Sequence, residues 1–324
     1  MPHPRDVLIG AQAAASLLPV CDHYSGVLAR MTKSLQLQAE MTEEFGTCVF
    51  DCTLDCEDGA PVGGEAEHAQ LVAELVQGAS ERGRVGARVH PVDHPAFEND
   101  MATIAGRAGR RLSHIMIPKV ESVDDVDRAE RALLAAYPAG LPLHVLIESP
   151  GAVHRAFEIA AHPRVQSLSF GLMDFVSAHA GAIPADGMGA AGQFSHPLVV
   201  RAKLEIASAA HAAGKVPSHC VVTEFKDETA MRSAARRAAR EFGYTRMWSI
   251  HPSQIRPILE AFAPDERQVD EATRLLLAAE RAEWAPISFD GSLHDRASYR
   301  HFWQVLERAH ATGRVLPAEA ARWF

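Results

Sequence analysis

The stretch "TCVFDCTLDCEDGAP", residues 47–61, carries two alternating patterns that are typical of one β-strand. Residues two apart on a strand share a face, so the cysteines of this stretch lie on one face with Phe50 and Leu54. The other face carries acids that gather toward the end of the strand, at Asp51, Asp55 and Glu57. A buried free cysteine behaves as a small hydrophobic residue, whereas a zinc site needs closer pairs such as C-x-x-C. The pattern therefore favours cysteines that pack against helices and acids that face an interior.

Seven further apolar runs, separated by amphipathic segments, extend this pattern along the chain. They cover residues 16–20, 85–90, 114–120, 143–149, 165–171, 216–222 and 246–252. The segment 123–137 shows the helical spacing, with Val123, Val126, Ala129, Leu133 and Tyr137 on one face. Alternating strands and helices imply parallel strands with crossover helices. Eight repeats predict a closed (β/α)8 TIM barrel, whose chemistry lies where the strands end.

A helical stretch continues beyond the eighth run to the C-terminus, interrupted by "APISFDGSLHD", residues 285–295. Eight strand–helix units already complete a barrel, so this stretch is additional. We therefore expect a barrel catalytic domain over residues 1–285 and a C-terminal extension over residues 286–324. The extension is expected to cap the barrel, to reach a neighbouring subunit, or both.

Composition excludes several classes of protein. The 324 residues are 47% hydrophobic and 23% charged, as in ordinary globular proteins. A net charge of −9 argues against nucleic-acid binding, and no apolar run reaches the roughly 18 residues of a membrane span. Five cysteines, an odd number, fit a reducing cytoplasm. Residues 7–21 faintly resemble a signal peptide, but Asp6 beside Arg5 and Gln12 within the apolar run argue against export.

Charged residues end several of the predicted strands. Arg88, Lys119, Glu148 and Asp174 each follow an apolar run. Glu148 and Asp174 follow consecutive strands, so their carboxylates are expected to converge. Two carboxylates completed by waters and substrate oxygens predict a Mg²⁺ or Mn²⁺ site. The alternative is a network of salt bridges that fills the mouth of the barrel, because an unpaired buried charge is costly.

Two helices are expected to begin beside these carboxylates. One begins at Gly151, and the other begins after Gly171, with Met173 in its first turn. The free backbone N–H groups at a helix start suit a substrate carboxylate. Gly151, Gly171 and Met173 are therefore candidates for substrate binding.

Seven motifs follow one another in an order that is more specific than any of them alone. They are "DCEDGAP", "RVH", "IPKVES", "LIESPGAVHRAFEIA", "LSFGLMDF", "SIHPSQI" and "FDGSLHD". The set resembles the HpcH/HpaI aldolase and citrate lyase β-subunit superfamily, on the side of the citrate lyase β-like and malyl-CoA lyase-like proteins. The resemblance runs from about Cys48 to about Asp295. It implies a magnesium-dependent barrel that makes or breaks a carbon–carbon bond next to a thioester, from a 2-oxo acid and an acyl thioester.

The resemblance also implies roles for individual residues. Glu148 and Asp174 would bind the metal, and Arg88 would contact the substrate. Asp295, which ends "DGSLHD", would be the catalytic acid/base and would reach in from a neighbouring subunit of a trimer or hexamer. The residues expected to support the metal and its waters are Glu57, Asp58 and Lys119.

Some positions depart from the family pattern. The first strand reads "SLLPVCDHYSG", where the family usually has a basic residue near the coenzyme A phosphates. His90 replaces the asparagine of the family's "vRvN" motif. These departures leave open whether the acyl group is carried by coenzyme A, by an acyl-carrier protein, or is a free acid.

Several alternatives stay open at this stage. Lys119 either bridges carboxylates or forms a Schiff base. His251 is either a general base or a structural hydrogen-bonding group. Residues 232–241 either bind phosphate or form a solvated helix face. The carbon–carbon lyase also has rivals: a thioester hydrolase, an aldolase for free 2-oxo acids, and a catalytically silent metabolite-binding protein.

Overall fold

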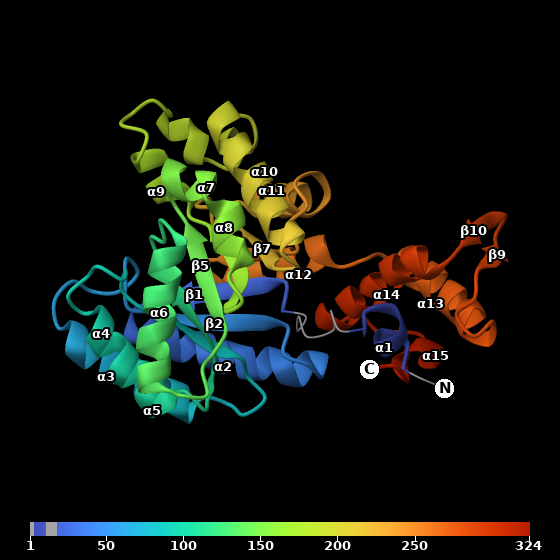
Figure 1. Ribbon diagram of the computed structural model, residues 1–324, viewed down its shortest axis with the longest axis horizontal. Coiled ribbons are helices and arrows are strands. Elements are labelled where there is room, and N and C mark those ends of the chain that lie inside the picture. The colour runs from blue at the N-terminus through green and yellow to red at the C-terminus, as the bar shows by residue number, and fades with distance from the viewer. Residues whose placement is uncertain (1–2, 11–17) are drawn as a thin grey trace. The chain divides into compact units, whose positions relative to one another are not determined.

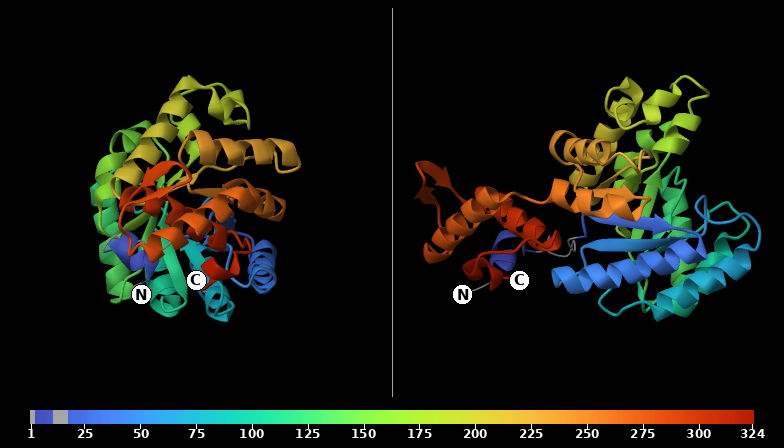
Figure 2. Two further views of the ribbon diagram at one scale, coloured as in Figure 1. Left: turned by 90° about the vertical axis from the view of Figure 1, so that its right-hand side faces the viewer. Right: turned by 180° about the vertical axis from the view of Figure 1, so that it is seen from behind.

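The computed structural model describes residues 3–10 and 18–324. The chain forms two compact units (Figures 1 and 2). One unit spans Pro19–Ala261, and the other joins the described residues before Pro19 to Phe262–Phe324. Residues 11–17 lie outside the described residues, and with them part of the signal-like stretch and the start of the first apolar run.

Eight parallel strands close into a barrel in chain order, which confirms the predicted (β/α)8 fold (Figure 1). The first and last strands pair with each other and complete the ring. The strands are β1 (Cys21–Ser25), β2 (Phe50–Asp55), β3 (Val85–Arg88), β4 (Leu112–Ile117), β5 (Leu143–Ile147), β6 (Val165–Phe170), β7 (Val216–His219) and β8 (Arg246–Ser249).

Helices follow the strands around the barrel. The α-helices of this unit are α2 (Leu28–Phe45), α3 (Glu65–Gly78), α4 (Phe97–Asp100), α5 (Gly106–Ala108), α6 (Val123–Ala136), α7 (Pro150–His154), α8 (Ala156–Ala161), α9 (Leu172–Ser177), α10 (Pro197–Ala212), α11 (Glu228–Glu241) and α12 (Ile255–Phe262). Shorter elements are the π-helix η2 (Met101–Ala105) and the 3₁₀ segments η3 (Ala185–Met188), η4 (Gly192–Phe194) and η5 (Pro252–Gln254).

Helix α6 illustrates how local sequence sets these helices. Ser122 and Asp125 form a capping box that satisfies free N–H groups of the first turn. The predicted apolar face is confirmed, because Val126, Ala129 and Leu133 are buried. The helix therefore begins at a polar cap and covers the strands with its apolar face.

Strand β2 has the two faces that its sequence predicts. Thr53 donates a hydrogen bond to Asp22 on β1 and contacts His114 on β4, so its side chain lies inside the barrel. On the outside, Gln38 of α2 donates to the Phe50 carbonyl. All five cysteines carry free thiols, as the spacing argument expects.

The first strand begins later than the apolar run suggests. The run covers residues 16–20, whereas β1 starts at Cys21 and contains the buried polar residues Asp22 and His23. The reason is that Asp22 faces a basic partner inside the barrel, since Arg246 lies 2.9 Å from its carboxylate. Hydrophobicity alone therefore does not locate this strand.

The second unit has its own core. It contains α1 (Pro4–Leu8), α13 (Glu266–Arg281), β9 (Ile287–Phe289), β10 (Ser292–His294), α14 (Arg296–Ala311) and α15 (Ala318–Ala321). Leucines, alanines and tryptophans of this unit pack together, among them Leu276, Trp303 and Trp323. The expected interruption forms a β-hairpin, whose turn residues Asp290 and Gly291 both have positive φ.

Helix α13 belongs to the second unit. The boundary expected after residue 285 lies on the other side of this helix. Helix α13 packs on α14 and shares its apolar core. Whether residues 1–285 and 286–324 act as separate functional domains stays a prediction.

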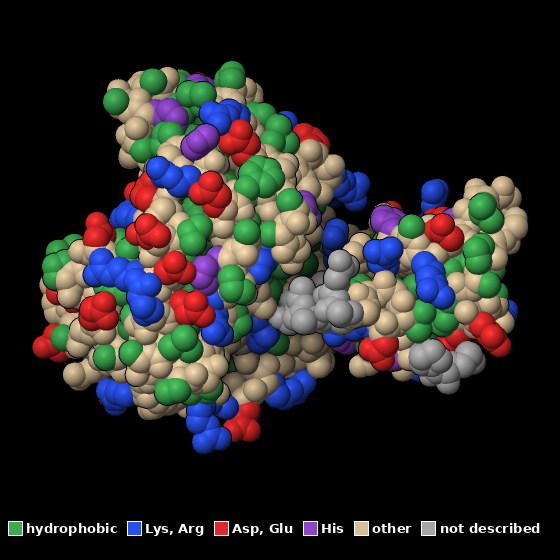
Figure 3. Space-filling model, in the orientation of Figure 1, with side chains coloured by type: hydrophobic (Ala, Val, Ile, Leu, Met, Phe, Trp, Pro, Cys, Tyr) green, Lys and Arg blue, Asp and Glu red, His purple; other side chains and the backbone are tan. Residues whose placement is uncertain are grey.

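Among the described residues, no helix is long and apolar enough to cross a membrane. Charged side chains of both signs are mixed on the face shown in Figure 3.

Candidate active site

Charged side chains gather where the strands of the barrel end. They come from the last residue of β3 and from the segments that follow β2, β4, β5 and β6. The group consists of Glu57, Asp58, Arg88, Lys119, Glu148 and Asp174, and ion pairs and mutual electrostatic effects connect its members. The structure thus brings together six of the predicted site residues.

Arg88 is held rigidly by its acidic neighbours. Its guanidinium donates two hydrogen bonds of 2.6 Å to the Asp55 carboxylate, and its third nitrogen lies 3.1 Å from Glu57. The rings of Tyr24 and Trp248 lie 5.2 Å and 5.8 Å from the guanidinium carbon. A two-pronged pair of this kind fixes both orientation and position. Arg88 is therefore a preorganised cation at the mouth of the barrel.

Lys119 bridges the acids that follow β2. Its ammonium group pairs with Glu57 and lies 3.6 Å from Asp58. Although burial lowers it, the hydrogen bond to Glu57 raises the pKa of Lys119 above its usual value. A lysine held in its charged form cannot attack a carbonyl, so the geometry favours the bridging interpretation over the Schiff base.

Glu148 and Asp174 form the acidic centre of the group. Burial, and then the charge of Asp174, raise the pKa of Glu148 to about 8. The backbone N–H of Lys119 donates to one Glu148 oxygen at 2.8 Å. A Cβ added to Gly171 would lie 2.2 Å from the other oxygen, so this glycine leaves the carboxylate room. Two neighbouring carboxylates, one of them buried, fit a hard divalent cation, which would offset their charge.

The predicted substrate-binding residues lie at two helix starts. Gly151 is in the first turn of α7, where the Ser149 side chain accepts a hydrogen bond from the Ala152 N–H. Met173 is in the first turn of α9, which has no side-chain cap. Met173 and Asp174 are partly exposed beside buried neighbours. Direct contact of these residues with substrate remains a prediction.

Asp295 lies in the other unit, at the start of α14. It is exposed, and its carboxylate accepts hydrogen bonds from the N–H groups of Ala297 and Ser298 at 2.9 and 3.3 Å. The carboxylate therefore has a structural role as a helix cap. Its catalytic role in another subunit stays a prediction.

Sequence reasoning missed a second polar layer, near the beginnings of the strands. Arg246 lies 2.9 Å from Asp22 and 2.7 Å from Asp51, and all three are buried. Arg84 donates to Asp51 at 2.7 Å. Although burial raises it, Arg246 and Arg84 hold the pKa of Asp51 below its usual value. The alternation in β2 placed Asp51 inside the barrel, but it did not reveal the pairing of Asp51 and Asp22 with Arg246 across the ring.

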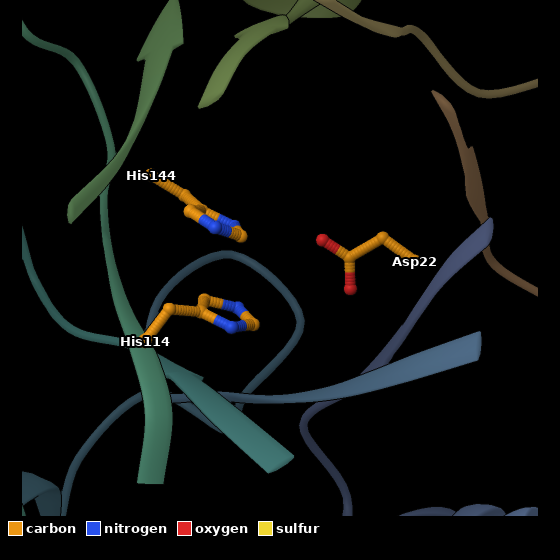
Figure 4. A group of neighbouring side chains, drawn as sticks. All are labelled: Asp22, His114 and His144. Carbon is orange, nitrogen blue, oxygen red and sulfur yellow. The ribbon is translucent and has the colours of Figure 1, made fainter. Parts of the chain in front are cut away.

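Two histidines stack within this layer. The rings of His114 and His144 lie 3.8 Å apart and nearly parallel, opposite the Asp22 carboxylate (Figure 4). One ring nitrogen of each histidine and one Asp22 carboxylate oxygen lie within 4.8 Å of one another, close enough to hold a metal ion. However, Thr53 and Arg246 already engage both Asp22 oxygens, and Mg²⁺ prefers oxygen ligands. This layer therefore fits a buried ion-pair network better than a magnesium site.

An apolar cluster is built two residues farther along the same strands. Tyr24, Met116, Leu146 and Trp248 each follow an inward residue of the polar layer by two positions. Glu148 follows Leu146 by the same step. The period of two therefore stacks polar, apolar and acidic layers inside the barrel.

For His251 and for the arginines of α11, the contacts favour structural roles. His251 caps η5, because its ring nitrogen accepts from the Ser253 N–H at 3.2 Å, and its ring stacks on Phe225. The arginines of α11 lie on its outer face, where Arg232 pairs with Glu228 and Glu260. These contacts support a helix cap and a solvated helix face, respectively.

Two similar proteins are a lyase and a thioesterase named for malyl-CoA. The chain is 29% identical over 277 residues to an L-malyl-CoA/β-methylmalyl-CoA lyase from Cereibacter sphaeroides, covering 79% of this chain and 86% of the relative. It is 28% identical to a (3S)-malyl-CoA thioesterase from the same species, over 71% of this chain and 74% of the relative.

Solved structures agree with these relatives. A citrate lyase from Burkholderia xenovorans LB400 is 49% identical, with all of both chains covered and a TM-score of 0.82. Protein CitE from Mycobacterium tuberculosis, solved with magnesium, acetoacetate and coenzyme A, shares the fold at 22% identity and a TM-score of 0.65, over 91% of this chain and 99% of that protein. The profile of the family described as HpcH/HpaI aldolase/citrate lyase matches residues 34–252. The chain therefore belongs to the HpcH/HpaI aldolase/citrate lyase family.

Proposed function

We propose that this protein is a Mg²⁺-dependent carbon–carbon lyase that acts on a β-hydroxyacyl thioester. Malyl-, citramalyl- and citryl-thioesters are the candidate substrates, and the products are a 2-oxo acid and an acyl thioester. The observation that carries the proposal is the pair of carboxylates at the mouth of the barrel, buried Glu148 and partly exposed Asp174, beside the fixed cation of Arg88.

Glu148 and Asp174 would hold the cation. It would supply positive charge beside the carboxylate and hydroxyl oxygens of the substrate. The lyase name of the Cereibacter relative and the magnesium in the CitE structure support this assignment. Mn²⁺ satisfies the same oxygen ligands and is expected to substitute.

The chain's own residues divide the remaining work. Arg88 supplies fixed positive charge beside the oxygens where negative charge develops. Asp295 of a neighbouring subunit removes the hydroxyl proton, and the O–H electrons form the carbonyl of the oxo acid. The electrons of the carbon–carbon bond pass to the thioester as an enolate. Free backbone N–H groups at α9 orient the oxo-acid carboxylate.

A thioester is preferred over a free acid because it makes a more stable enolate. The coenzyme A in the CitE structure supports coenzyme A as the carrier of the acyl group. An acyl-carrier protein would present the same thioester. Thioester hydrolysis is the second candidate function. It is favoured by one specific observation, the likeness to a malyl-CoA thioesterase.

Product analysis tests the proposal. The protein is incubated with Mg²⁺ and each of the three thioesters, and the products are identified by mass spectrometry. Release of an oxo acid with an acyl thioester is expected, and Glu148→Gln and Asp295→Ala should abolish it. Release of the free hydroxy acid with a free thiol would assign the hydrolase. If no thioester is cleaved although the protein binds Mn²⁺, the lyase proposal is wrong.

A further inference from the structure

A buried histidine–aspartate pair lies beside the site and has no role in the scheme above. His90 follows β3 by two residues, and its ring nitrogen Nδ1 lies 2.6 Å from Asp100 Oδ2. The same oxygen accepts the His90 backbone N–H at 3.0 Å. Asp100 is fully buried and ends α4, where the chain passes into the π-helix η2. Such π segments often accompany functional sites.

The strand geometry places His90 on the inner side of the mouth. Gly86 and Arg88, four and two residues earlier, face His114 and Asp55 inside the barrel. The Val89 N–H still donates to the Met116 carbonyl, so the extended pairing continues beyond β3. By the period of two, His90 therefore lies on the same side as Arg88.

The charges around His90 favour its protonated form. The hydrogen bond to Asp100 raises the pKa of His90, and the charges of Glu57 and Glu65 act in the same direction. His94 stacks on the ring at 4.2 Å. The other ring nitrogen, Nε2, has no hydrogen-bond partner among the described residues, and about a tenth of the side chain is exposed. A histidine fixed through one nitrogen and free at the other is suited to proton transfer.

We propose that His90, oriented by Asp100, is the proton donor that converts the enolate into the released acyl thioester. This inference rests on the proposed lyase function. In cleavage, the Nε2–H proton passes to the enolate carbon, the enolate electron pair forms the new C–H bond, and the imidazole becomes neutral. The proton that Asp295 takes from the hydroxyl leaves to solvent, and His90 regains one from solvent. In the reverse direction, neutral His90 removes the proton of the acyl carbon.

His90→Asn separates this role from a structural one. An asparagine amide keeps an N–H donor for Asp100 but has no proton that it can release and regain near neutral pH. We expect the variant to fold and to bind Mn²⁺ as the wild type does. Its cleavage rate should fall by roughly 10²-fold, the usual contribution of general acid catalysis. The decline of the wild-type rate at high pH, where His90 loses its proton, should be absent from the variant.

Asp100→Asn tests the positioning residue. Without the carboxylate, the pKa of His90 should fall, so the alkaline limb of the rate profile should move to lower pH. Histidine NMR titration should show the same movement without any substrate. His162→Asn is the matched control, because His162 also pairs with an aspartate, Asp127 at 3.1 Å, but precedes β6 at the other end of the barrel. It should leave the rate and its pH profile unchanged.

Proton exchange distinguishes failure of this inference from failure of the lyase function. Acyl thioester, Mg²⁺ and an unreactive oxo-acid analogue are incubated in D₂O, and loss of the acyl-carbon protons is followed by NMR. Exchange by the wild type that His90→Asn loses supports the inference, even if no oxo acid is released. Oxo-acid release and exchange that are unchanged in His90→Asn overturn it while the lyase function stands. Absence of both reactions in the wild type overturns both.

Discussion

At the scale of single residues, the site depends on close approaches that glycine and arginine make possible. Gly171 lies against one oxygen of Glu148, and the Lys119 N–H binds the other. Arg88 is locked by Asp55. A carboxylate and a cation held in this way need no rearrangement when charge develops nearby.

Gly171→Ala should therefore weaken metal binding. The new methyl carbon would lie 2.2 Å from Glu148 Oε1, so the carboxylate must move. We expect the affinity for Mn²⁺, measured by electron paramagnetic resonance, to fall about 10-fold or more. Gly78→Ala is the control, because a Cβ there meets nothing within 4 Å. Equal affinities in the two variants would show that Glu148 does not bind the metal.

Arg88→Lys should lose most activity while the protein stays folded. Lysine keeps the charge but cannot donate two parallel hydrogen bonds to Asp55. A loss of roughly 10²-fold in kcat/KM is expected, as for removal of one oriented donor. Arg84→Lys is the matched control, since Arg84 pairs with Asp51 in the polar layer, near the beginnings of the strands and away from the site. An unchanged kcat/KM in Arg88→Lys would assign Arg88 to salt-bridge filling.

At the scale of the elements, the strands carry buried histidines that must stay neutral. Burial lowers the pKa of His23 to about 4 and that of His114 to about 3. It also holds the pKa values of His144 and His219 well below the usual value. These histidines therefore stay neutral in the folded barrel at pH values where the unfolded chain would protonate them.

Stability should fall as the pH falls from about 6.5 toward 4. In this window the unfolded chain binds protons that the folded chain does not, which costs about 1.4 kcal/mol per pH unit for each histidine. The raised pKa of Glu148 acts in the opposite direction, so variants isolate the effect. The free energy of unfolding, measured by urea unfolding at several pH values, should change less steeply with pH in His23→Gln than in the wild type. The difference should be the contribution of one histidine, about 1.4 kcal/mol per pH unit. His154→Asn, which changes an exposed histidine, should keep the wild-type slope. Equal slopes in all three proteins would contradict this assignment.

At the scale of the whole molecule, the residues proposed for catalysis lie in two separate units. Glu148, Asp174 and Arg88 belong to the barrel, whereas Asp295 belongs to the unit that contains α14. The family resemblance implies a trimer or a dimer of trimers in which Asp295 serves a neighbouring subunit. That assembly remains a prediction.

Subunit complementation tests it. Glu148→Gln and Asp295→Ala should each be inactive alone. After co-expression, mixed oligomers would contain sites with Glu148 from one chain and Asp295 from another, so part of the activity should return. Each variant expressed alone is the control. Mixed oligomers without activity, or a wild-type protein that is fully active as a monomer, would contradict a role for Asp295 in another subunit.

The local alternation of residues was enough to predict the barrel and the acids at its mouth. Strand–helix repeats, the two faces of β2 and the charges at the strand ends depend on neighbours in the sequence, because side-chain direction on a strand has a period of two. Glu148 and Asp174 could be paired in advance because they follow consecutive parallel strands. The site residues shared with the family came from the ordered motifs.

Other features depend on which strands meet when the barrel closes. Arg246 joins Asp22 and Asp51 because β8 pairs with β1, more than 200 residues earlier in the chain. His90 meets Asp100 because the loop after β3 folds back onto its strand end. Such contacts decide which buried charges are neutralised and which histidine is free to carry a proton. They follow from register and ring closure, which no local pattern encodes, since the same alternation permits many pairings across an interior.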